Sequence, residues 1–192
     1  MLTEFTNRAD SMRGGYLLKT EELLTANKDA WTAAFAEHFI SACTRIVKMQ
    51  AEQSLSALSY LEYTMLYTNF IDRRYISEVW VYGQESYLDR NQRAVCEYDV
   101  SFLFVYFDEL WGELTALQRQ YSGRISAQDI TAYMLRALPD FYSYLADIAR
   151  LALAECIAGE PFISIAKNNI FMINTGDYMA GVQTVFEINN TE

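Results

Sequence analysis

The sequence contains few of the residues on which metal centres and common catalytic sites depend. Among 192 residues there is one histidine, His38, and there are three widely spaced cysteines, Cys43, Cys96 and Cys156. A helical di-iron site needs two Glu-x-x-His motifs and a zincin helix needs two histidines, so neither can be built. The cysteine spacing suggests neither a disulfide framework nor a zinc knuckle. We therefore expect reduced thiols and no bound metal.

Turn-forming residues are also scarce. Only two prolines and eight glycines interrupt the chain, which argues against a β-sandwich with many turns and favours long helices. The glycines form no phosphate-binding pattern, because Gly14-Gly15 is followed by Tyr16-Leu17 and no Lys-Ser/Thr pair closes a loop. We expect neither a nucleotide nor another cofactor.

Positive charge is in the minority, with 15 basic residues against 25 acidic ones and a formal net charge of -10. The resulting field repels phosphate and anionic lipid, so nucleic acid and membrane surfaces are not expected partners. The longest nearly apolar run, Val100 to Phe107, is far shorter than the roughly 20 residues of a membrane span. Charged residues interrupt the first thirteen positions, which argues against a signal peptide. These features predict a cytoplasmic protein.

Apolar residues recur at helical spacing over much of the chain, and 52% of all residues are hydrophobic. A stripe from Trp31 to Met49 predicts a first helix, and a second stripe from Leu55 to Leu66 is out of phase with it. A break with Ser54 as N-cap resolves the mismatch and gives an antiparallel helical hairpin. Three more helices follow, the second capped by Ser126 and the third started by Pro139. The five expected helices span residues 28–50, 54–72, 99–121, 126–137 and 139–158.

Two short segments instead have the composition of strands. Residues 75–88 begin with YISEVWVY, which is rich in β-branched and aromatic residues, and predict a β-hairpin. Residues 162–174 place Asn168-Asn169 between two strand-like runs and predict a second hairpin. The tail over residues 176–188 is compatible with either a helix or a strand. The predicted fold is a single, mostly α domain: a five-helix bundle with two hairpins that can form a small flanking sheet.

Four polar residues interrupt the apolar stripes of the predicted helical hairpin. An antiparallel register that pairs Arg45 with Glu62 also pairs His38 with Asn69. One interpretation is a ligand-binding or acid-base pocket with a perturbed Glu62. The other is a buried ion pair between Arg45 and Glu62 that fixes the helix register, together with a hydrogen-bonded core histidine.

The densest mixture of aromatic and charged side chains lies between Asp72 and Arg90. Tyr, Trp and Arg are enriched where proteins bind one another, because they combine a large contact area with a polar group. The alternative is a small sheet with its aromatic residues in the core and its arginines exposed. The candidate interaction surface consists of Arg73, Arg74, Trp80, Tyr82, Tyr87, Asp89 and Arg90.

Two functions of different classes follow from these patterns. The first is a non-enzymatic interaction protein, such as an inhibitory or immunity-type factor, that binds a basic protein or another copy of itself through the aromatic hairpin. The second is a small-molecule-binding or enzymatic domain with its pocket near His38, Arg45, Glu62 and Asn69. A flat aromatic surface favours the first hypothesis, and an enclosed polar pocket favours the second.

Overall fold

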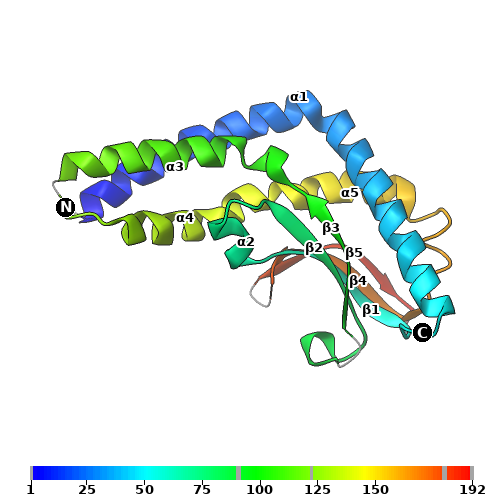
Figure 1. Ribbon diagram of the computed structural model, residues 1–192. Coiled ribbons are helices and arrows are strands. Elements are labelled where there is room, and N and C mark those ends of the chain that lie inside the picture. Colours follow the sequence, from blue (N-terminus) through cyan, green and yellow to red (C-terminus); the bar gives the residue numbers. More distant parts are fainter. Residues whose placement is uncertain (1, 90–91, 122, 179–180, 191–192) are drawn as a thin grey trace.

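The protein has an α/β fold in a computed structural model that describes residues 2–89, 92–121, 123–178 and 181–190 (Figure 1). One long N-terminal helix and three further main helices accompany a five-stranded mixed sheet. The α-helices are α1 (Leu2–Ala51), α2 (Tyr67–Ile71), α3 (Val105–Gln118), α4 (Ala127–Tyr142) and α5 (Tyr144–Cys156). Short 3-10 helices are η1 (Ser86–Leu88), η2 (Ser101–Leu103) and η3 (Arg119–Tyr121). The strands are β1 (Leu58–Met65), β2 (Ile76–Tyr82), β3 (Arg93–Asp99), β4 (Lys167–Asp177) and β5 (Val182–Asn189).

The predicted five-helix bundle is therefore wrong, and the largest error concerns the helix expected over residues 54–72. This segment forms strand β1 and the short helix α2. Because β1 lies in the middle of the sheet, seven of its eight residues are buried, and apolar residues occur on both of its faces. A strand of this kind does not alternate between apolar and polar residues, so its apolar residues can imitate a helical stripe.

The helix expected over residues 28–50 is only the second half of α1, which runs for 50 residues from Leu2 to Ala51. Its buried residues shift round the helix by about 100° between the Phe5 to Thr20 half and the Phe35 to Ile46 half. Figure 1 shows the reason, since α1 bends: its first half lies along α3 and α4 and its second half runs beside the sheet. Ser54 does not begin a helix, and its Oγ donates to the Met49 carbonyl at the end of α1.

The sheet has the strand order β3-β2-β1-β4-β5, with β1 and β4 parallel and the other neighbours antiparallel. The hairpin predicted over residues 75–88 is corrected, because β2 pairs with β3 and Tyr87 lies in η1 between them. The hairpin predicted over residues 162–174 is also wrong. Asn168 and Asn169 continue β4, and the hairpin partner of β4 is β5, so the ambiguous tail contains a strand.

The remaining helix boundaries differ from prediction in part. The segment predicted as a helix over residues 99–121 starts with the end of β3 and with η2, so α3 begins only at Val105. Ser126 caps α4 as predicted, in a reciprocal pair of hydrogen bonds with Asp129. Pro139 does not start a new helix, because α4 continues through it to Tyr142 and α5 follows at once.

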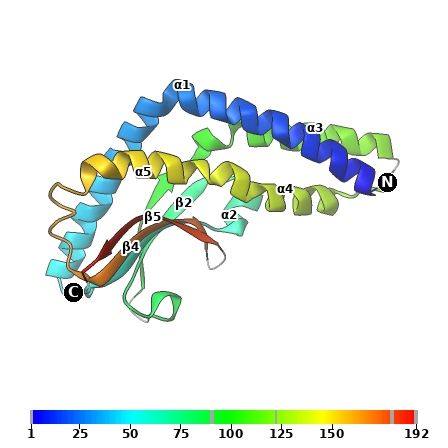
Figure 2. The same ribbon diagram turned by 180° about the vertical axis from the view of Figure 1, so that it is seen from behind.

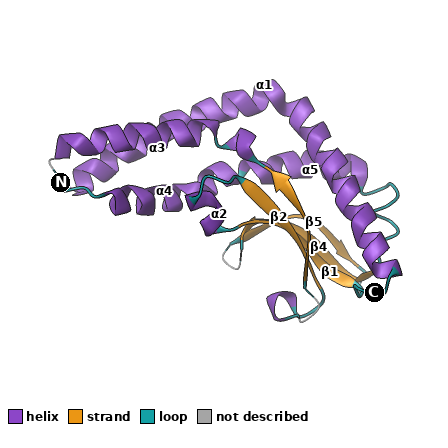
Figure 3. Cartoon of the chain, viewed as in Figure 1, coloured by secondary structure: helices purple, strands orange, loops and turns teal. Residues whose placement is uncertain are grey.

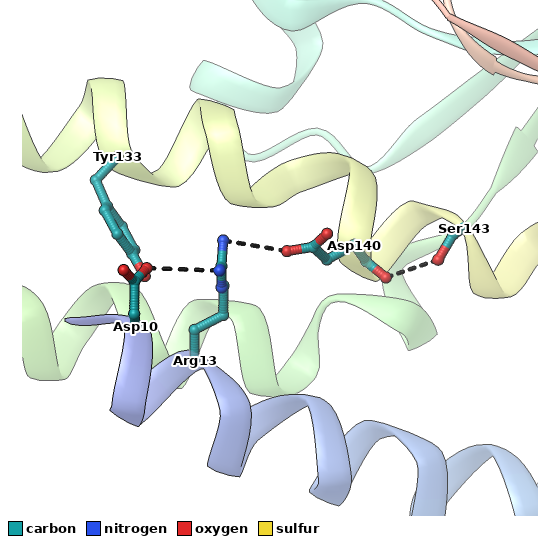
Figure 4. Close-up of polar contacts among 5 residues, drawn as sticks. All are labelled: Asp10, Arg13, Tyr133, Asp140 and Ser143. Carbon is teal, nitrogen blue, oxygen red and sulfur yellow. Dashed lines mark hydrogen bonds and ion pairs between the residues drawn. The ribbon is translucent and has the colours of Figure 1, made fainter. Parts of the chain in front are cut away.

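Helices α1, α4 and α5 contact one face of the sheet, and one core of buried residues joins both layers. Figure 2 shows α4 and α5 from behind as a nearly continuous rod above the strands, and Figure 3 shows α1, α4 and α5 on this side of the sheet. Farther along the rod, the first half of α1 is tied to α4 by polar contacts (Figure 4). Tyr133 Oη donates to Asp10 at 2.8 Å, and Arg13 forms an ion pair with Asp140 at 3.2 Å.

Candidate sheet-face site

Side chains on the two faces of the sheet differ because successive residues of a strand point in opposite directions. On β1, Tyr63 faces the helices, where its ring contacts Phe35 and His38 of α1. Its neighbour Glu62 therefore faces away from them. We call this second side, which α1, α4 and α5 do not cover, the outer face.

The centre of the outer face holds a buried carboxylate. Glu62 is 2% exposed, and its register partners on the two flanking strands are Trp80 of β2 and Asn174 of β4. Asn174 Nδ2 donates to Glu62 Oε1 at 2.9 Å, and Tyr87 Oη donates to Glu62 Oε2 at 2.8 Å. Both donors are neutral, and no cationic side chain among the described residues forms an ion pair with this carboxylate.

A second carboxylate on this face lies opposite a third. Glu78 of β2 pairs directly with Glu97 of β3 in the strand register. Glu78 Oε2 accepts a hydrogen bond from Trp80 Nε1 at 2.9 Å, and Glu78 Oε1 accepts one from Asn69 Nδ2 at 3.4 Å. These donors are again neutral. Like charges directly opposite one another destabilise a sheet, so this pair lowers the stability of the fold.

Aromatic rings surround these carboxylates. The Trp80 ring lies 5.8 Å from the Tyr178 ring and 6.4 Å from the Tyr82 ring, centroid to centroid. Tyr87 contacts both Tyr82 and Tyr178, at 5.1 Å and 6.0 Å. Trp80, Tyr87 and Tyr178 are partly exposed, whereas Tyr82 is fully buried. Burial raises the pKa of Tyr82, and the nearby Glu62 carboxylate raises it further, so its hydroxyl stays protonated.

On the outer face, the residues of the described strands include acidic side chains from four of the five strands and no basic side chain. The strands contain two basic residues, and both point elsewhere: Arg93 pairs with Val81 of the helix-covered face, and Lys167 Nζ donates to the Phe162 and Ile165 carbonyls. None of the acidic residues forms an ion pair within the part of the chain that the structure describes. The acidic residues of the outer face are Glu62, Glu78, Glu97, Asp99 and Glu187.

The structure assembles only part of the predicted interaction surface. Trp80, Tyr82 and Tyr87 lie together on the outer face, but Arg73 belongs to another region, where it forms an ion pair with Asp108 and lies over the Trp111 ring. Arg74 is exposed in the turn before β2. Asp89 accepts a hydrogen bond from the Gly83 backbone at 2.5 Å and thereby closes the loop that carries Tyr87. Arg90 lies outside the described residues.

The predicted pocket around His38, Arg45, Glu62 and Asn69 does not form. His38 contacts Tyr63 on the helix-covered face, whereas Glu62 lies on the outer face. The predicted pairing of Arg45 with Glu62 is wrong, because the second helix of the predicted hairpin is a strand that turns Glu62 away from α1. Arg45 lies near Cys96 and borders a surface hollow with Lys48 and Glu52. Asn69 joins the outer-face cluster through Glu78.

His38 and Cys96 come close, with His38 Nε2 and Cys96 Sγ 3.6 Å apart, but they do not form a nucleophile-base pair. His38 Nε2 also lies 3.1 Å from the Glu97 carbonyl, which can only accept, so this nitrogen carries the proton. Nδ1 then accepts from Tyr63 Oη at 3.1 Å. The imidazole therefore has no free lone pair for Cys96, and burial raises the pKa of the Cys96 thiol to about 11.

The residues of the outer face that the sequence analysis missed include Glu78, Glu97, Asn174 and Tyr178. The segment Tyr75 to Tyr82 was correctly predicted as a strand, and its alternation already places Glu78 on the same side as Trp80. The other three residues come from β3, β4 and the turn after β4. No local pattern indicates that these segments meet.

Comparison of this chain with family models, with curated proteins and with solved structures found no match. Among the described residues, no three or more His, Cys, Asp or Glu side chains lie close enough together to hold a metal ion. Within the same residues, none of the helices combines the length and the apolar character needed to cross a membrane.

Proposed function

We propose that the protein binds a Lys- or Arg-rich segment of a partner protein on the outer face of its sheet. The observation that carries the proposal is Glu78 directly opposite Glu97, both without a cationic partner among the described residues. This arrangement costs stability in the free protein. A bound cation between the two carboxylates would turn that repulsion into attraction.

The aromatic residues suit the same ligand. Trp80 lies beside Glu78, and the Tyr178 ring lies beside Trp80. Both side chains are partly exposed, and rings of this kind attract ammonium and guanidinium groups. Arginine fits best, because its planar guanidinium can stack on a ring while it donates two parallel hydrogen bonds to a carboxylate. The site thus combines charge with flat apolar area, as binding hot spots do.

The charge of the whole chain selects among partners. A formal net charge of -10 steers a basic protein toward the surface and repels nucleic acid. It also opposes pairing of two outer faces from two copies of the chain, because each would bring the same carboxylates. The function belongs to the interaction class, and a small inhibitor or an immunity-type factor would work in this way. A reducing, cytoplasmic location is part of the proposal, because Cys43, Cys96 and Cys156 are free thiols.

An oligo-arginine peptide tests the proposal by titration calorimetry, with oligo-lysine and oligo-glutamate peptides as comparisons. We expect oligo-arginine to bind most tightly, oligo-glutamate not to bind, and the affinity to fall between about 0.05 M and about 0.5 M salt. Glu97→Gln should weaken binding several-fold. The matched control is Glu22→Gln, which removes the same charge from an exposed position on α1.

Equal losses in the two variants would mean that the peptide senses only the general field, and would overturn the proposal. Trp80→Ala separates the aromatic contribution, because it should speed dissociation while leaving the association rate and its salt dependence nearly unchanged. Gel filtration at several salt concentrations tests the self-association alternative. Assembly that strengthens with added salt would favour a second copy over a basic partner.

A further inference from the structure

The two edges of the sheet differ in how they are covered. At one edge, α1 lies beside β3, and His38 Nε2 donates to the Glu97 carbonyl. At the other edge, β5 pairs only with β4 among the described residues, and Figure 2 shows β5 in front of the other strands with α5 above it. The eight residues of β5 include neither lysine nor proline, which proteins commonly place on an edge strand to prevent further pairing. Two usual protections of an edge strand are therefore missing from β5.

Some backbone groups of β5 point toward this open edge. Residues of an antiparallel ladder alternate between pairs that exchange hydrogen bonds and pairs whose N–H and C=O groups point away from each other. The Asn190 amide donates to the Asn169 carbonyl at 2.9 Å, so this pair is of the first kind. Glu187 lies three residues earlier in the same register and therefore belongs to a pair of the second kind. Its N–H and C=O point away from β4.

Counting from the other end of β5 gives the same result for Thr184. The Asp177 amide donates to the Gly181 carbonyl at 3.0 Å, and Thr184 lies three residues after Gly181 in the same register. The N–H and C=O of Thr184 therefore also point away from β4. The register is irregular between Thr184 and Glu187, because β5 has one extra residue there, Val185. Both Thr184 and Glu187 are exposed.

These two positions are related by a possible two-fold symmetry. When a second copy of β5 runs antiparallel with the symmetry axis between Val185 and Phe186, Thr184 of each copy lies opposite Glu187 of the other. Outward-pointing groups then meet outward-pointing groups, as in the hydrogen-bonded pairs of a continuous sheet. Sliding the second copy by one residue in either direction would break both pairs, because Thr184 and Glu187 would then face residues whose groups point toward β4.

The same register suits the side chains. Glu187 is the only charged residue of β5, and it would face Thr184 of the second copy, so two glutamates would not lie directly opposite each other. Val185 and Phe186 pack against the core on the helix-covered side. Across the axis, Val185 of each copy would face Phe186 of the other, and cross-strand pairs of an aromatic and a β-branched residue stabilise a sheet. Backbone and side chains thus favour the same partner, a second copy of this strand.

We infer that two copies of this chain pair antiparallel along β5 and join their five-stranded sheets into one continuous sheet. The axis of such a pair stands perpendicular to the sheet, so both outer faces lie on one side and remain open. The dimer then holds two of the proposed peptide surfaces on the same side, which would strengthen binding to a partner with two basic segments. The pairing itself does not rest on the proposed function, because it uses the backbone of β5 and not Glu78 or Glu97.

Sedimentation equilibrium tests the inference in about 0.5 M salt, which screens the repulsion between two chains of net charge -10. We expect a monomer at about 5 μM and a dimer at about 500 μM, because one pair of strands is a small interface. Thr184→Pro removes an N–H that points to the open edge and that β4 does not need, so it should lower the association constant by about tenfold or more. Its affinity for oligo-arginine at low salt should not change, so the two proposals can fail separately.

Amide hydrogen exchange locates the interface. The Thr184 and Glu187 amides should exchange more slowly as the protein concentration rises, because the second copy pairs with them. The Gln183 amide belongs to a pair of the hydrogen-bonded kind with Thr175 of β4, so its exchange should depend less on concentration.

A pair of lysine variants tests the register and keeps the test valid if Thr184→Pro is poorly folded. Thr184→Lys places a lysine opposite Glu187 of the other copy, twice in each dimer, so it should raise the association constant several-fold at about 0.1 M salt. The matched control Gln183→Lys adds the same charge at the next residue, which would face Ile188 instead, and should have a smaller effect. Equal gains in the two variants would overturn the proposed register.

Two further outcomes would overturn the inference. One is a protein that stays monomeric at the highest concentration. The other is undiminished assembly of a folded Thr184→Pro variant, which would place the second copy on another surface, such as the outer face.

Discussion

The two faces of the sheet differ in composition, because one is mainly apolar and buried and the other carries several carboxylates. The helix-covered face buries Leu61, Tyr63 and Val81 completely, and the Tyr63 hydroxyl is paired with His38. The outer face, built from the alternate residues of the same strands, holds Glu62, Glu78 and Glu97 without any counter-ion in the described chain. Apolar burial on the first face stabilises the fold, whereas repulsion between carboxylates on the second face destabilises it.

This difference teaches how to distinguish a structural surface from one adapted to a ligand. Burial alone does not separate them, because Glu62 is as deeply buried as many core residues. The distinction lies in compensation, since natural cores pair their charges and hydrogen-bonding groups. Uncompensated charge that lowers stability is typical of functional sites. Substitutions on the two faces should therefore have opposite consequences.

The largest effect is expected from Tyr63→Ala on the helix-covered face. The substitution removes a fully buried ring that contacts Phe35 at 4.9 Å and leaves His38 Nδ1 without its donor. We expect a loss of about 3–5 kcal/mol in the free energy of unfolding, measured by urea denaturation. Peptide affinity of the folded fraction should not change. A loss below about 1 kcal/mol would remove the contrast between the faces.

A smaller loss is expected from Glu62→Ala on the outer face. The substitution leaves the Asn174 amide and the Tyr87 hydroxyl without their acceptor, which should cost about 1–3 kcal/mol. Glu62→Gln should cost less, because the amide oxygen can still accept from Asn174 and the Tyr87 hydroxyl can reverse its role. Urea denaturation of both variants measures the difference. A glutamine variant less stable than the alanine variant would show that a cationic group compensates the charge of Glu62.

Glu97→Gln should change stability in the opposite direction. Removing one of two facing carboxylates should raise the free energy of unfolding by about 0.2–1 kcal/mol while it weakens oligo-arginine binding. Glu78→Gln in the Glu97→Gln background should add little, since the repulsion is already gone. A double-mutant cycle by urea denaturation measures this coupling. A destabilised Glu97→Gln protein would contradict the proposed strain.

The smallest effect concerns His38, whose pKa is lowered by burial. Its folded pKa then lies below the unfolded value of about 6.5, so the unfolded state binds more protons as the pH falls. Stability from the neutral imidazole is fully present above about pH 6.5 and declines as the pH falls toward the folded pKa. Because His38 is the only histidine, its ring protons can be followed directly by NMR titration. A midpoint above 6.5 would contradict the assigned hydrogen bonds. Urea denaturation of His38→Asn isolates its part of the pH dependence.

The sequence predicts those parts of the fold whose stabilising contacts lie between residues close together in the chain. The Ser126 cap was predicted correctly because its hydrogen bonds involve Asp129, only three residues away. The Asn168-Asn169 turn was predicted wrongly for the complementary reason. Asn168 Nδ2 donates to the Ala57 carbonyl and to Ser59 Oγ, so a residue typical of turns is satisfied inside a strand by a segment more than a hundred positions away.

The residues of the candidate sites differ in the same way. The strand around Trp80 and its aromatic character could be predicted, and with them Trp80, Tyr82 and Tyr87. Asn174 beside Glu62 could not, because the parallel pairing of β1 with β4 joins residues 112 positions apart. Asp177 gave no signal at all, since an isolated acidic residue near a chain end resembles any solvated side chain. Only the folded chain places it across a hollow from residues of the α4-α5 junction.

The sequence by itself determined the acidic charge, the scarcity of metal ligands, the capped start of α4 and the strand character of Tyr75 to Tyr82. These properties depend on composition or on neighbours within one turn or one strand. Only the tertiary structure decided that residues 58–65 form a central strand, that Glu78 faces Glu97 and that Asp177 lines a hollow. Alternation tells which residues of one strand share a face. Which strands become neighbours is settled by the packing of the whole core, where contacts between distant segments outweigh local propensity.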